Sequence, residues 1–226
     1  MIGHERRRYI ISSTNISWNL PCVHAILVVC LLALASITAG CGGGRGDNAV
    51  VASLKSLQGK VEARPNGTAA FAAATADLAL SVGSAVRTGE DGQAQLRYSD
   101  GTDVTLQPET YYEIKDRTSL GRQESGSARY RVTPQQKSVG VETPHGVTAV
   151  LGTVFRLDVT AQQTVVTLQE GKVRFTSAAG DSVELTPGQQ VTAPAGTAPG
   201  KPIELDPFTL ESLFNPGSKS PAINQR

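Results

Sequence analysis

The chain has 226 residues, with 21 Lys and Arg against 20 Asp and Glu, so its formal net charge is +1. The charges form no basic stripe, which argues against a nucleic-acid partner. Aromatic residues are scarce at 5 % and 23 residues are glycine, a composition that favours a turn-rich β protein over a helical bundle.

An apolar run near the N-terminus has the form of an export signal. It covers residues 25–37, too few for a comfortable membrane span, and follows three arginines at 6–8. The run ends in Thr-Ala-Gly-Cys at residues 38–41. This pattern resembles a bacterial lipoprotein signal, in which the signal peptide (here 1–40) is removed and the cysteine (here Cys41) is lipidated. A cleaved secreted form and an uncleaved inner-membrane anchor remain the alternatives.

The residues after the signal fit a surface tether. Cysteines occur only at 22, 30 and 41, so no later cysteine could pair with Cys41. We expect residues 41–52, which are glycine-rich, to form a lipidated, flexible tether to the membrane. The resemblance implies the periplasmic side of the cell envelope, and the absence of aspartate after Cys41 favours the outer membrane.

The main body of the chain, residues 53–193, alternates apolar and polar side chains with a period of two. About ten short strands are indicated, each with one apolar and one polar face, as in antiparallel sheets that are covered on one side. Turn signals such as Ser99-Asp100-Gly101 separate them. The pattern predicts an all-β fold, either an antiparallel β-sandwich, a barrel or a short β-solenoid.

Two segments of this body are echoed later in the chain. Residues 57–63 resemble 168–175, and residues 100–106 resemble 180–185. Such an internal pseudo-repeat predicts two related β units that pack together. Two copies are too few for an open repeat array, which favours a closed sandwich or a short coil of strands.

Two segments depart from the strand pattern. Residues 68–80 are rich in alanine, but their apolar residues are not one-sided, so we expect a loop with at most one helical turn. Residues 194–226 form a Pro/Gly-rich linker and a C-terminal tail, in which 206–214 could form a short helix. This helix would either dock on the β domain or bind a partner.

Several short motifs, taken in order, resemble a FecR-type domain. Its first half is matched at residues 82–114, with V-G-S-A-V-R-T-G and D-G-T-D-V-T-L, and its second half at 139–191, with L-G-T-V-F-R-L and E-G-K-V. The glycines should adopt backbone angles that larger residues avoid, and the apolar members should point inward. The resulting fold-signature residues are Gly89, Gly101, Gly152, Thr153, Phe155, Gly171, Val173 and Gly188.

The resemblance implies an all-β periplasmic domain. The best-known members relay signals from outer-membrane receptors to a sigma-factor system bound at the inner membrane. They carry a cytoplasmic helical segment that holds the sigma factor, whereas only 24 residues precede the apolar run here. We therefore expect a lone FecR-like binding or scaffolding module whose partner is another envelope protein. A role in envelope signalling through a separate anti-sigma protein, or in carbohydrate or peptidoglycan binding, remains the alternative.

Catalytic chemistry is not indicated, and no cofactor or metal is expected. His145 is the single histidine after Cys41 and lies in a turn motif, where we expect it to be exposed and non-catalytic. Acidic residues fall on polar strand positions, and no spacing singles out a pair. The remaining candidates are Tyr98, Tyr111, Tyr112 and Tyr130, of which Tyr111 is expected to be the most exposed and the others to belong to the core.

Overall fold

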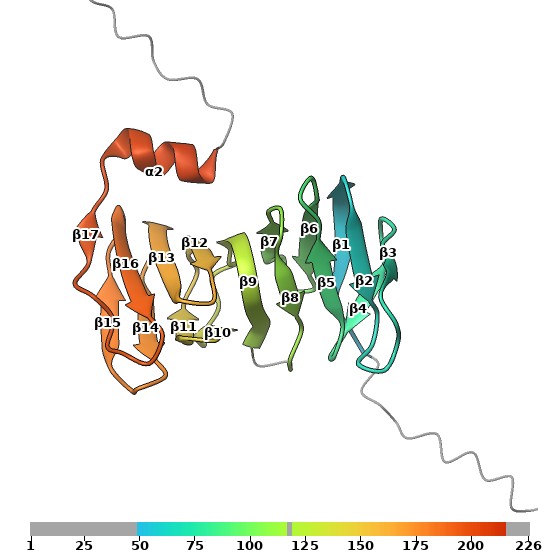
Figure 1. Cartoon of the computed structure of the whole chain (residues 1–226), viewed down its shortest axis with the longest axis horizontal. Coiled ribbons are helices and arrows are strands. Elements are labelled where there is room, and N and C mark those ends of the chain that lie inside the picture. The colour runs from blue at the N-terminus through green and yellow to red at the C-terminus, as the bar shows by residue number, and fades with distance from the viewer. Residues whose placement is uncertain (1–48, 117–118, 216–226) are drawn as a thin grey trace, which may run out of the picture. The chain divides into compact units, whose positions relative to one another are not determined.

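The computed structural model describes residues 49–116 and 119–215. Within these residues the chain forms seventeen strands and one helix, which confirms the all-β prediction (Figure 1). All strand pairings but one are antiparallel; the exception joins β9 and β10. The expected signal peptide and Cys41 lie outside the described residues.

The strands form two sheets that share one strand. Sheet A runs in the order β4 (Ala79–Ser81), β1 (Val50–Gln58), β6 (Gln93–Tyr98), β7 (Asp103–Leu106), β9 (Ser119–Arg131), β12 (Val154–Val159), β13 (Gln163–Glu170), β16 (Gln189–Pro194) and β17 (Ile203–Glu204). Sheet B runs in the order β3 (Ala72–Ala73), β2 (Val61–Arg64), β5 (Ala85–Thr88), β8 (Tyr111–Glu113), β9, β10 (Val139–Thr143), β11 (Gly146–Val150), β14 (Val173–Ser177) and β15 (Ser182–Leu185).

The inward residues of both sheets form one continuous core, so the fold is a sandwich. Tyr112 from sheet B lies 6.4 Å from Tyr130 of sheet A, measured between ring centroids. Tyr130 in turn stacks on Phe155 at 4.7 Å. All three side chains are at most 1 % exposed. The alternation seen in the sequence therefore reports the inner and outer faces of these two sheets.

Strand β9 passes from one sheet to the other. Its first part pairs with β8 and β10 in sheet B, and its second part, from Gly126, pairs with β7 and β12 in sheet A. Gly126 has φ +83°, and a Cβ atom there would lie 2.4 Å from the Cα of Thr110. The turn into sheet A therefore requires a residue without a side chain.

Only one of the two internal sequence similarities corresponds to a structural similarity. Residues 57–63 and 168–175 both lead a strand of sheet A round a corner into sheet B, from β1 to β2 and from β13 to β14. Residues 100–106 and 180–185 do not correspond in this way, since β7 lies in sheet A and β15 in sheet B. Similar turn chemistry, rather than an equivalent position, explains the second echo.

The loop expected at residues 68–80 is wrong in part, because this segment contains β3 and β4 and no helical turn. Leu80 is fully buried and pairs with Ala52 of β1. Ala72 and Ala73 add to the edge of β2. Main-chain pairing and the burial of one leucine thus outweigh the helix propensity of the alanines.

The C-terminal tail forms helix α2 (Pro207–Phe214), which docks on sheet A (Figure 1). The Asp206 carboxylate caps its start by accepting hydrogen bonds from the N–H groups of Phe208 and Thr209 at 3.1 and 3.0 Å. At its end, Arg129 donates to the carbonyl of Phe214 at 2.7 Å, and Phe214 is only 1 % exposed. A cation at a helix C-terminus also interacts favourably with the helix dipole.

We expect Gly126→Ala to lower the free energy of unfolding by at least about 2 kcal/mol, because positive φ and a steric clash both oppose the new methyl group. Gly180→Ala is the matched control. Gly180 has a similar φ of +95°, but a Cβ there meets nothing within 4 Å. Urea denaturation measures both; equal effects would contradict the crowding assigned to the turn in β9.

Phe214→Ala should release α2, because the buried ring contributes about 3 kcal/mol to its docking. We expect the amides near the end of α2 to lose hydrogen-exchange protection while the strands keep theirs. Phe208→Ala provides the control, since Phe208 is 51 % exposed and should change little. Unchanged protection of α2 in Phe214→Ala would show that two hydrogen bonds are sufficient for docking, the one from Arg129 and the one from Arg156 to the carbonyl of Leu213 at 3.0 Å.

Candidate docking surface

The outer face of β11 carries an apolar stripe where a sandwich normally presents polar residues. Val147 and Ala149 lie at alternate positions of β11, and Leu151 follows directly after the strand; we call these three residues the β11 stripe. Val147 is 43 % exposed and Leu151 is 55 % exposed. Inward-facing Val150, by contrast, is 2 % exposed. Apolar side chains on both faces of one strand indicate that the outer face meets something other than water.

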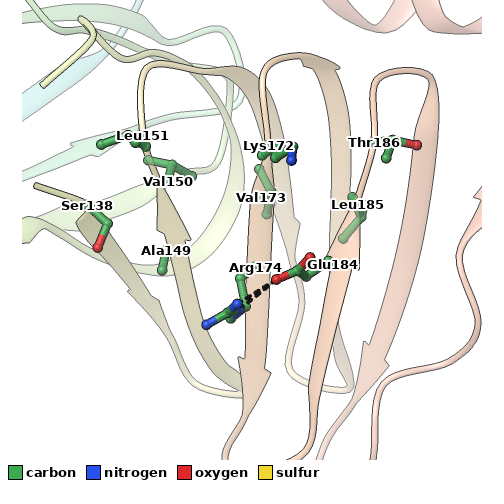
Figure 2. Close-up of a pocket in the computed structure, with 10 residues that line it drawn as sticks. All are labelled: Ser138, Ala149, Val150, Leu151, Lys172, Val173, Arg174, Glu184, Leu185 and Thr186. Atoms are coloured by element: carbon green, nitrogen blue, oxygen red, sulfur yellow. Dashed lines mark hydrogen bonds and ion pairs between the residues drawn. The ribbon is translucent and has the colours of Figure 1, made fainter. Parts of the chain in front are cut away.

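A depression of about 260 Å³ lies beside the stripe (Figure 2). Among its lining residues is Ala149 on β11, whose side chain is small and whose cross-strand neighbour on β14 is Arg174. Leu151 and Ser138 stand at one end, and Thr186 lies across the opening on the far side. A protruding apolar side chain of a partner could enter this depression.

The rim of the depression is charged. Arg174 on β14 donates from Nε to Glu184 on β15 at 3.0 Å, as the dashed line in Figure 2 marks. This hydrogen bond, together with the positive charges of Arg174 and Lys172, holds the pKa of the Glu184 carboxyl below its usual value. Within the described residues Lys172 makes no ion pair, so the rim keeps one positive charge and suits an acidic neighbour.

The outer edge of β15 is open. Sheet B ends with β15, and no other strand pairs with it among the described residues. An edge strand leaves main-chain N–H and C=O groups available to an extended segment of another chain. The depression, the charged rim and the open edge thus lie together on one end of sheet B.

Sequence reasoning missed the β11 stripe. The alternating pattern predicts strands with one polar face. Residues 147–151, Val-Thr-Ala-Val-Leu, contain no charged residue and so do not follow that pattern. The interruption of the alternation was the available signal. Thr148, the polar member of the run, is buried in the interior.

The tyrosines lie largely as expected. Tyr98, Tyr112 and Tyr130 are buried, and burial raises the pKa of all three phenols. The hydroxyls of Tyr98 and Tyr112 lie 2.7 Å apart and both donate toward the carbonyl of Leu120. These three residues belong to the core, and only Tyr111 is partly exposed.

His145 lies in a turn, but the expectation that it is exposed is wrong, because the residue is only 4 % exposed. Its Nδ1 lies 2.9 Å from the hydroxyl of Thr164, which donates to Thr143 at 3.0 Å. Thr143 ends β10 of sheet B, and Thr164 lies on β13 of sheet A. His145 therefore joins the two sheets, a role that a turn motif in the sequence does not reveal.

The fold-signature residues occupy turns and the core. Phe155 and Val173 are buried as expected, and Thr153 is buried beside them. Four of the five glycines have positive φ, namely Gly101, Gly152, Gly171 and Gly188. Gly89 does not share this conformation; a Cβ there would instead lie 3.1 Å from Cβ of Lys60. Close approach rather than backbone angle explains glycine at position 89.

Other kinds of site find no support in the described part of the chain. No group of three or more His, Cys, Asp and Glu residues gathers there as a metal site requires. The same residues contain no helix that is long and apolar enough to cross a membrane.

Comparison with known proteins gives a family match. Residues 84–174 match the family model described as FecR protein. The matched segment runs from just before β5 into β14, and so includes β9 and the β11 stripe. A comparison with curated proteins finds none that matches the chain.

Two crystal structures described as a "putative anti-sigma factor from Parabacteroides distasonis ATCC 8503" are similar to this chain. The structures at 1.65 and 2.50 Å resolution give TM-scores of 0.50 and 0.49, each with 20% sequence identity over 57% of this chain. The alignments cover 64% and 63% of the other chains, so this chain spans a little under two thirds of their length. At this identity the 1.65 Å structure supports the fold alone.

Proposed function

Because the chain carries a FecR-like domain, we propose that it is a non-enzymatic binding module of the cell envelope. In this proposal, lipid on Cys41 holds the protein at the periplasmic side of a membrane, the outer membrane in preference to the inner. Another envelope protein docks on the β11 stripe. The exposed stripe on an otherwise polar sheet face is the observation that carries the proposal.

The partner that fits this surface is an extended segment with a protruding apolar side chain. The apolar side chain would fill the depression beside Ala149, and main-chain groups would pair with the open edge of β15. An acidic residue next to it would meet Lys172. Burying a side chain such as Leu151 contributes about 1.5–3 kcal/mol, enough to dominate a small interface.

Envelope signalling is the second function supported. The FecR match favours it. Under this alternative, the segment bound on the β11 stripe would belong to a receptor or to a separate anti-sigma protein. The identity of the bound partner separates signalling from scaffolding.

We expect a photo-crosslinking amino acid at position 147 to give one discrete adduct in intact envelopes. The additional substitution Leu151→Asp should reduce that adduct at least about tenfold, because a charge would have to be buried in the depression. A crosslinker at Ile203 is the control, since this residue is 57 % exposed but lies on β17, away from the stripe. Equal labelling from positions 147 and 203 would contradict docking on the β11 stripe.

Replacing Cys41 with serine should move the protein from the membrane fraction to the soluble periplasmic fraction. Stable attachment depends on several acyl chains, and serine would carry none of them. Cys30→Ser is the matched control because residue 30 lies inside the expected signal peptide. If Cys41→Ser sediments with membranes as before, the lipid anchor on Cys41 is wrong.

A further inference from the structure

A second depression, of about 330 Å³, lies on the outer face of sheet B beside β5, β8 and β9. It is bordered by the loop after β5 and the turn before β8. Arg87, Glu90, Glu109, Tyr111 and Ser125 supply its polar groups. The depression is thus shallow, polar and built round one tyrosine ring.

Glu109 is held in an unfavourable backbone conformation. Its φ is +55°, and it follows Pro108 in a turn where glycine or asparagine is ordinarily found. The N–H of Glu109 donates to the carbonyl of Gly89 at 3.1 Å, which fixes this turn against the loop after β5. Glycine would be less strained at this position, so the presence of glutamate favours a functional role for its carboxylate.

The ring of Tyr111 is held in place by its neighbours. Phe71 contacts it edge-on, with 6.0 Å between the ring centroids. The guanidinium carbon of Arg87, on the adjacent strand, lies 4.4 Å from the centroid of the Phe71 ring. Tyr111 therefore offers a fixed, partly exposed aromatic surface that loses little side-chain freedom on binding.

The polar groups around this ring include both donors and acceptors. Arg87 uses its Nε to donate to Glu62 at 2.9 Å, and its terminal nitrogens make no other hydrogen bond within the described residues. Glu90 and Glu109 supply acceptors, and Ser125 can do both. Sugar hydroxyls both donate and accept, whereas an ammonium group only donates and would leave the donors of Arg87 without an acceptor. The mixture favours a polyhydroxyl ligand over a lysine side chain.

The charges at the depression indicate which kind of sugar would bind. Glu62 neutralises Arg87, and the two carboxylates of Glu90 and Glu109 outnumber the one ammonium of Lys60, whose side chain lies close to Gly89, so the excess charge at the depression is negative. An acidic sugar would be repelled by them. The depression therefore suits an uncharged hexose.

We propose that the Tyr111 depression is a binding site for neutral polysaccharide. One face of a hexose ring would stack on Tyr111, its hydroxyls donating to Glu90 and Glu109 and accepting from Arg87. This site is separate from the β11 stripe and does not depend on a protein docking there.

Affinity electrophoresis of the full chain in detergent, through gels that contain a soluble polysaccharide, tests the proposal. Mixed-linkage β-glucan, galactomannan and dextran are the neutral probes, and alginate is the acidic one. At least one neutral probe should retard the protein, and Tyr111→Ala should weaken that retardation at least tenfold. Retardation by alginate alone, or by no probe, overturns the proposal.

Two further variants separate binding from folding. Glu109→Gly should raise the melting temperature, because glycine adopts positive φ without strain, and should weaken polysaccharide retardation at least tenfold. Phe208→Ala removes an aromatic side chain that is also exposed but lies on α2, and its retardation should match that of the unmodified protein. A stabilised Glu109→Gly that binds as before would also overturn the proposal.

Discussion

The sandwich depends on one strand that belongs to both of its sheets. Gln123 lies in the sheet B part of β9, is fully buried, and donates to the carbonyl of Gly126 at 2.8 Å. Its side-chain oxygen accepts from the hydroxyl of Tyr130, in the sheet A part of the same strand, at 2.8 Å. A buried amide without these partners would destabilise the fold by about 1–3 kcal/mol. In each sheet β9 pairs with one strand from the preceding half of the chain and one from the following half, β8 and β10 in sheet B and β7 and β12 in sheet A. The strands on both sides of β9 therefore depend on its conformation.

The two sheets differ in what covers their outer faces. On sheet A, Arg129 and Arg156 each donate to a carbonyl at the end of α2, and Phe214 fills the space between helix and strands. Sheet B has no comparable cover among the described residues, and both candidate surfaces lie on it. An inner face fixes the fold, whereas an uncovered outer face is free to carry binding groups without disturbing the core. The function of this protein is therefore best sought on sheet B.

Local patterns in the sequence predicted the all-β class and inward-facing residues well, but they indicated about ten strands where the described residues form seventeen, and they did not identify strand partners. Alternation identifies an inward residue such as Phe155 because the side-chain period of a strand is a local property. Whether a strand joins sheet A or sheet B depends on corners such as Gly126, where close contact with Thr110 comes from a distant turn. His145 was misjudged for the same reason, since its partner Thr164 is 19 residues away on the other sheet. The strained backbone of Glu109 could not be predicted either, because the residue type alone does not determine the backbone angle φ.

The order of the strands makes the two candidate surfaces independent of each other. Tyr111 lies on β8 and the β11 stripe on β11, with β9 and β10 between them. Three strand spacings of about 4.8 Å separate them by roughly 14 Å, which exceeds the screening length of about 8 Å at physiological ionic strength. The charges of Arg122, Glu124 and Glu142 on the intervening strands are already paired with one another. A substitution at one surface should thus leave the other unaffected, while their shared sheet face would let one envelope structure engage both at once.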